Sequence, residues 1–86
     1  MTDLLSPLAA DVIGMIGSAL MVVAYAYSNM VAKMNFLFFN LLNLVGSLLL
    51  IASLTVHFNM ASMALEIVWA LIAVLGLIKV LRKAAA

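Results

Sequence analysis

The sequence contains no cysteine, which excludes disulfide bonds, zinc–thiolate sites and thiol catalysis. Charged residues are also scarce, because only 8% of the 86 residues are Asp, Glu, Lys or Arg. Four basic residues against three acidic ones create no positive field, so a nucleic-acid partner has no electrostatic support. The single histidine, His57, forms no metal cluster, and no Ser-His-Asp set or glycine-rich phosphate loop can be assembled. We therefore expect no enzymatic activity, no cofactor and no metal.

Apolar residues make up 70% of the chain. A soluble domain of this size cannot hide that much apolar surface, because small domains leave a large share of their surface wet. The lipid bilayer is the solvent that fits this composition.

Three apolar segments are expected to cross the bilayer as helices, since each has the roughly 20 residues that a span requires. They are Val12–Met30, Phe36–Val56 and Ala61–Leu81. The turns between them, Val31–Asn35 and His57–Met60, are short enough to make neighbouring helices antiparallel. The fold predicted is therefore all-α, an integral membrane three-helix bundle that forms one domain over residues 1–86.

The start of the first helix is marked by Pro7 and Asp11, with Asp11 as the expected N-cap. The residues before it include no Lys or Arg, unlike a signal peptide, so we expect the first apolar segment to remain as a spanning helix.

The basic residues predict the orientation of the chain. With three spans, the first turn and the C-terminus lie on the same side, which then carries Lys33, Lys79, Arg82 and Lys83. The positive-inside rule places that side in the cytoplasm and the N-terminus outside. In a bacterium this is a multi-pass protein of the inner (plasma) membrane, with a periplasmic N-terminus.

Glu66 is the one acidic residue inside an apolar segment. An acid at the bilayer centre costs about 2.5–3.5 kcal/mol on the insertion scale, so such residues usually face a protein interior or a water-filled cavity. Three interpretations stay open. Glu66 lies shallow and reaches the interface as a packing or solubility residue, or it lines a cleft and binds a solute or proton, or it pairs with a partner protein.

The helix that carries Glu66 places several informative residues on one stripe at about 100° per residue. These are Ser62, Glu66, Trp69, Ala73 and Gly76. Ala73 and Gly76 would let another helix approach closely. Trp69 is either the aromatic wall of a cleft or a packing residue.

The other two segments also carry small and polar residues. Gly14 and Ser18 form a small-xxx-small pattern typical of helix contacts, and Gly46 offers a similar site in the second segment. Asn40, Asn43 and Ser47 share one face of that segment, where the asparagines act either as interhelical bonds or as part of a cleft. By depth, Tyr25 and Asn43 are expected toward the cytoplasmic side, and Ser18, Ser53, Glu66 and Trp69 toward the outer side.

The stretches AYAYSN, LNLVGSLLLIASL and MALEIVWALIAVLGLIK resemble a family of small, uncharacterised bacterial three-helix membrane proteins, over about Val12 to Arg82. More loosely, the chain is similar to SemiSWEET half-transporters. That resemblance implies a parallel homodimer around a solute path, with the N-terminus outside and Glu66 near a sugar-binding position. The stretch equivalent to the Pro-Gln hinge of SemiSWEETs reads YAYSNM, and the aromatic expected late in the second helix falls near Leu50.

These observations predict a minimal half-transporter that acts as a homo-oligomer and passes a small polar solute by alternating access. Glu66 would bind the solute or a proton, Trp69 would stack on the solute, and Asn43 with Tyr25 would line the inner gate. The predicted solute-binding residues are Glu66, Trp69, Asn43, Tyr25 and Ser47, and the predicted packing residues are Gly14, Ser18, Gly46, Ala73 and Gly76. The alternative is an accessory or structural subunit of a larger membrane complex.

Overall fold

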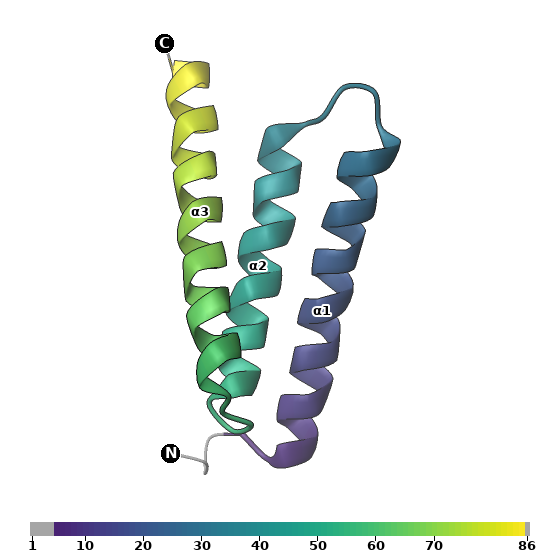
Figure 1. Cartoon of the computed structure of the whole chain (residues 1–86). Helices are drawn as coiled ribbons and strands as arrows, with labels where there is room; N and C mark the ends of the chain where they lie inside the picture. The colour runs from purple at the N-terminus through teal and green to yellow at the C-terminus, as the bar shows by residue number, and fades with distance from the viewer. Residues whose placement is uncertain (1–4, 86) are drawn as a thin grey trace.

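Three long helices make up most of the computed structural model, which describes residues 5–85 (Figure 1). They are α1 (Pro7–Met30), α2 (Phe36–Leu54) and α3 (Met60–Ala85). All three are long and apolar enough to cross a membrane. Neighbouring helices run antiparallel, so the α1–α2 loop and the C-terminal end of α3 lie at the same end of the molecule (Figure 1). The predicted all-α, three-helix architecture is confirmed.

The helix ends differ from the prediction by a few residues. Helix α1 begins at Pro7, because the Ser6 hydroxyl accepts a hydrogen bond from the backbone N–H of Ala9 at 3.0 Å and proline fits the first helical position. The prediction of Asp11 as the N-cap is therefore wrong, since Asp11 lies in the second turn. Helix α2 ends at Leu54, two residues early, and α3 continues four residues past Leu81.

Asparagine side chains start the other two helices. The Asn35 side-chain oxygen accepts the backbone N–H of Phe38 at 3.1 Å, and that of Asn59 accepts the backbone N–H of Ser62 at 3.0 Å. Each bond satisfies one of the free backbone donors at a helix start. The Tyr27 hydroxyl accepts the backbone N–H of Asn35 at 2.8 Å, which ties the end of α1 to the start of α2.

Helix α2 is the middle helix, and it packs against both neighbours (Figure 1). Within residues 5–85, α1 and α3 have no α-carbons within 8 Å of each other. The chain is therefore a row of three helices, in which α1 and α3 meet only through α2.

The α1–α2 contact is a close approach of two backbones at Gly17 and Gly46. A β-carbon added at Gly17 would lie 2.8 Å from the Gly46 carbonyl oxygen, and one added at Gly46 would lie 3.0 Å from the Gly17 carbonyl oxygen. Gly14 faces Ser53 of α2, where an added β-carbon would lie 2.7 Å from the hydroxyl oxygen. Small residues at these positions let the helices pack without large side chains between them.

The α2–α3 contact uses a different face of α2, formed by Asn40, Asn43 and Ser47. At about 100° per residue, this face is turned by roughly 100° from the face of Gly46 and Ser53 that meets α1. Gly76 of α3 lies directly against the Asn40 side chain, which leaves no room for a β-carbon.

Most of the apolar surface of the chain is exposed. Only Ala10, Ala24 and Ala73 are fully buried among the apolar residues that the structure describes, and α3 has a single buried residue. An exposed apolar surface of this extent is compatible with contact to a lipid bilayer.

Candidate functional site

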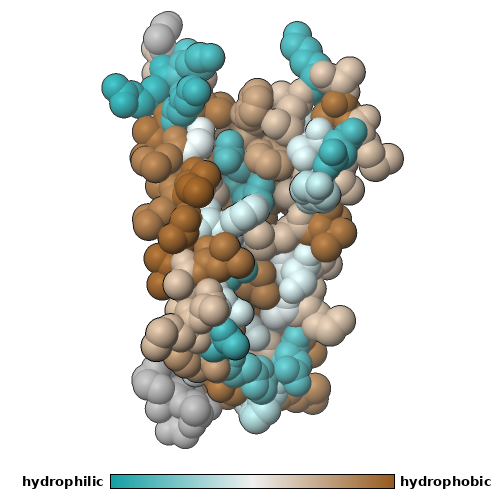
Figure 2. Space-filling view, viewed as in Figure 1, coloured by the Kyte–Doolittle hydropathy of each residue, from teal (hydrophilic) through white to brown (hydrophobic). Residues whose placement is uncertain are grey.

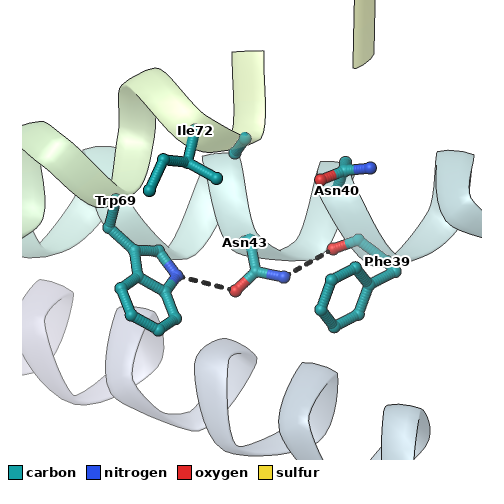
Figure 3. Close-up of a pocket in the computed structure, with 6 residues that line it drawn as sticks. Phe39, Asn40, Asn43, Trp69 and Ile72 are labelled. Carbon is teal, nitrogen blue, oxygen red and sulfur yellow. Dashed lines mark hydrogen bonds between the residues drawn. The ribbon is translucent and has the colours of Figure 1, made fainter. Parts of the chain in front are cut away.

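Asn43 and Trp69 form a hydrogen bond that joins α2 to α3 near the middle of both helices (Figure 3). The indole N–H of Trp69 donates to the Asn43 side-chain oxygen at 2.9 Å. The Asn43 amide nitrogen in turn donates to the backbone carbonyl of Phe39 at 2.9 Å. Asn43 is buried, whereas Trp69 is 43% exposed, so a large part of its ring remains open.

A pocket of about 220 Å³ lies beside this bond, between α2 and α3. Its lining consists of Phe39, Asn40, Asn43, Trp69, Ile72 and Ala73 (Figure 3). A second pocket of about 340 Å³ shares Phe39, Asn40 and Ile72 with the first and extends toward Lys79 and Lys83. The two pockets therefore form one groove along the α2–α3 contact.

Glu66 lies one turn of α3 before Trp69, close to the Ser47 side chain of α2. Its carboxyl oxygen Oε1 is buried and has no hydrogen-bond partner among residues 5–85. Ser47 is completely buried, and its hydroxyl also approaches the Met21 sulfur at 4.0 Å. A buried carboxyl oxygen without a partner costs free energy, so this atom is available to a proton, a cation or a hydrogen-bond donor.

The asparagines of α1 and α2 bond mainly within their own helices. Asn29, Asn40 and Asn43 donate to the carbonyls of Tyr25, Phe36 and Phe39, each four residues earlier. Of these three, only Asn43 has a side-chain hydrogen bond to another helix. The interhelical role that the sequence suggests for the asparagines therefore falls to Asn43.

The depth grouping expected from the sequence is wrong for one pair. Asn43 was expected on the cytoplasmic side and Trp69 on the outer side, but their hydrogen bond places them at the same level. The register between α2 and α3 brings together the pairs Ser47 and Glu66, Asn43 and Trp69, and Asn40 and Gly76.

The remaining predicted site residues lie at separate places. Tyr25 is on α1 and is 73% exposed, with no side-chain hydrogen bond to the Asn43–Trp69 pair. Gly14, Gly46, Ala73 and Gly76 lie in contacts between helices, whereas Ser18 is exposed and Gly17 occupies the α1–α2 contact instead.

At the opposite end from the C-terminus, the His57 ring nitrogen Nε2 lies 3.0 Å from an Asp11 carboxylate oxygen and 3.3 Å from the Pro7 carbonyl oxygen. Asp11, Ser18, Ser53, Leu50 and His57 are among the residues that line a shallow pocket there. Leu50 follows Asn43 by seven residues, two helical turns, so this pocket opens on the same side of α2 as the Asn43–Trp69 pocket.

We call this side of the molecule the polar face, defined by Asp11, Ser18, His57, Asn43, Trp69 and Lys79. Figure 2 shows hydrophilic and weakly polar colours along the middle of one face, between apolar flanks. No group of three His, Asp or Glu side chains within residues 5–85 is arranged to hold a metal ion.

Several residues of this site were not selected from the sequence. Phe39 precedes Asn43 by four residues and Ile72 follows Trp69 by three, so helical spacing alone could have added both to the lining. Gly17 was not selected, because the Gly14-xxx-Ser18 pattern favours a rotation of α1 that turns Ser18, rather than Gly17, toward the neighbouring helix.

A family model matches residues 10–84 of the chain, and the function of that family is uncharacterised. Neither the curated proteins nor the solved structures gave a significant match.

Proposed function

The chain belongs to the uncharacterised family whose model spans residues 10–84, and we propose that it is a minimal half-transporter that works as a homodimer. Two copies would face each other across their polar faces. The enclosed path would carry a small polar or cationic solute, and rocking of the two bundles would expose it alternately to the two sides of the membrane.

The observation that carries this proposal is the unpartnered Glu66 oxygen, which lies inside a membrane-spanning segment and one helical turn before Trp69 of the pocket. Ionisable groups within a transmembrane segment are costly and usually mark a solute, ion or proton path. The pocket adds an exposed indole ring and a buried amide, which are the kinds of group that orient a polar ligand in an otherwise apolar site.

Each residue has a distinct part in the proposal. The Glu66 carboxylate accepts a proton or the donor group of a solute, and the open face of Trp69 stacks on the solute or on its cationic group. Asn43 holds the indole in place and keeps one amide N–H beyond the bond to Phe39. Ser47 positions the carboxylate from α2, and Tyr25 contributes from the edge of the polar face once a second copy is present.

A second copy explains why polar groups stay on a face that would otherwise meet lipid. Ser18, Asn43 and Trp69 lie along that face together with the Asp11–His57 pair, and α1 and α3 do not close over it. Polar groups in the hydrocarbon layer need partners or water, and a facing copy would supply both. The basic end of the chain faces the cytoplasm in this arrangement, as the positive-inside rule requires.

The test is uptake into liposomes that contain the purified protein, with sugars, amino acids and amines as labelled solutes. Glu66→Gln keeps the shape and removes the charge, so it should abolish charge-dependent or proton-coupled uptake while assembly is retained. Glu66→Leu should also assemble, and with a gain in stability if the wild-type carboxyl is unpaired, because the insertion penalty disappears. Normal uptake by Glu66→Gln would remove Glu66 from the transport path.

The accessory-subunit role is the second candidate, and one observation favours it. Asn43 and Trp69 bond to each other rather than presenting free polar groups, as a purely structural pair would. The two roles differ in native mass after gentle detergent extraction. A self-contained dimer supports transport, whereas a single copy bound to other subunits, with no uptake of any solute class, supports the accessory role.

A further inference from the structure

The groove between α2 and α3 continues past the Asn43–Trp69 pocket to the end of the molecule that carries the C-terminus. Its pocket there, of about 340 Å³, is the more enclosed part of the groove. Its walls are mainly apolar and come from Phe36, Phe39, Ile72 and Val80. Lys79 and Lys83 lie at the end of the groove that is nearest the C-terminus. We propose that this groove binds one anionic phospholipid, with an acyl chain along the apolar walls and the phosphate on Lys79 and Lys83.

The shape of the groove fits an acyl chain rather than a compact solute. From Ile72 to Lys83 it follows α3 for eleven residues, about 16 Å at about 1.5 Å per residue. Gly76 adds no side chain to the floor, and the apolar walls offer few polar groups to a small hydrophilic molecule.

Charge complementarity selects the headgroup. Lys33, Lys79, Arg82 and Lys83, the four basic residues of the chain, all lie at or near this end. Asp11 lies at the opposite end, and Glu66 lies in the second turn of α3, toward that opposite end. Basic pockets between transmembrane helices on the cytoplasmic side are suited to anionic headgroups. The positive charges of Arg82 and Lys83 also interact favourably with the negative C-terminal end of the α3 helix dipole. Lys79 lies six residues before that end, outside the last turn, so the helix dipole does not account for its position.

The position of Lys79 and Lys83 on the helix supports a shared ligand. They are four residues apart, so both side chains lie on one side of α3 and can reach the same phosphate. Arg82 has an equal charge and does not line the groove, although it lines a separate, more open depression together with the same two lysines. Lipid binding needs only one chain and does not require transport, but a bound acyl chain and a transported solute would compete for the open face of Trp69.

The single tryptophan of the chain makes the binding measurable. Trp69 lines the end of the groove that is farthest from the lysines. It lies ten residues, or about 15 Å, from Lys79, where it would meet the middle of a bound acyl chain. Bromine atoms at mid-chain quench tryptophan fluorescence on contact. The protein is reconstituted into phosphatidylcholine vesicles that contain a small fraction of either mid-chain-brominated phosphatidylglycerol or equally brominated phosphatidylcholine.

We expect the brominated phosphatidylglycerol to quench Trp69 more strongly than the same fraction of brominated phosphatidylcholine. Lys79→Gln and Lys83→Gln should each lower this preference by about fivefold, which corresponds to about 1 kcal/mol for the loss of one hydrogen bond to the phosphate. Arg82→Gln is the matched control, because it removes the same charge outside the groove and should retain the preference.

Three outcomes would overturn the proposal. Equal quenching by the two brominated lipids would show that the groove does not select an anionic headgroup. An equal loss of preference in all three variants would show general attraction to the charged end rather than a site. Millimolar inorganic phosphate should leave the quenching unchanged; if it abolishes the preference, the lysines bind phosphate without the acyl chain and the lipid assignment is wrong.

Discussion

The approach of α1 to α2 at Gly17 gives a sharp test of the packing. In Gly17→Ala, the new β-carbon would lie 2.8 Å from the Gly46 carbonyl oxygen, where an ordinary contact is at least 3.4 Å. The two backbones would have to separate by about 0.6 Å, the difference between these distances, because the obstructing atom is backbone and cannot rotate away. Overpacking of this kind costs about 1–3 kcal/mol.

Gly14→Ala is the matched comparison, since it makes the same chemical change three residues earlier on the same helix. Its β-carbon would lie 2.7 Å from the Ser53 hydroxyl oxygen, which can turn to another rotamer at a cost of about 1 kcal/mol or less. The Ser53 β-carbon, 3.1 Å away, has to shift by only a few tenths of an ångström. Any gain in helix propensity from replacing glycine is shared by both variants and cancels in the comparison. Gly17→Ala should therefore be the more destabilising of the two, and Ser18→Ala, at an exposed position, should be neutral.

The measurement is unfolding by SDS in mixed micelles. Because the chain contains no cysteine, a donor and an acceptor dye can be attached through Leu8→Cys and Phe58→Cys, which lie exposed at the same end of the molecule. Loss of energy transfer reports separation of α1 from the α2–α3 loop. Equal stability of the Gly14 and Gly17 variants, or a larger loss with Ser18→Ala, would refute the rotation of α1 described above.

Two further predictions test the α2–α3 bond and the orientation. Trp69→Phe keeps an aromatic ring but removes the donor to Asn43. The free energy of unfolding in SDS should therefore fall by about 0.6 kcal/mol, and by no more than about 1.7, the range for such bonds in membranes. An unchanged free energy of unfolding would mean that the bond adds nothing to stability. A reporter fused after Ala86 should be active only in the cytoplasm, because the basic residues gather at that end, and periplasmic activity would reverse the orientation.

Helical spacing predicted which residues of the candidate site share a face of α3, but not which residues of α2 lie opposite them. Glu66, Trp69, Ala73 and Gly76 follow one stripe of α3 in the sequence, and the structure turns Glu66, Ala73 and Gly76 toward α2. Spacing within one helix depends only on helix geometry, so it survives folding. It says nothing about which residue of the next helix lies opposite, and Asn43 was accordingly expected at the wrong depth relative to Trp69.

Three apolar helices, their order and the gathering of basic residues at one end followed from the sequence, because hydropathy and charge are properties of each segment alone. The tertiary structure decided that α2 is central, that Gly17 rather than Ser18 meets Gly46, and that Ser47 is buried beside Glu66. These features depend on the rotation and axial register of each helix. A shift of one residue turns a side chain by about 100°. The close approach of the backbones at Gly17 and Gly46, and the contact of the Asn40 side chain with Gly76, fix that choice.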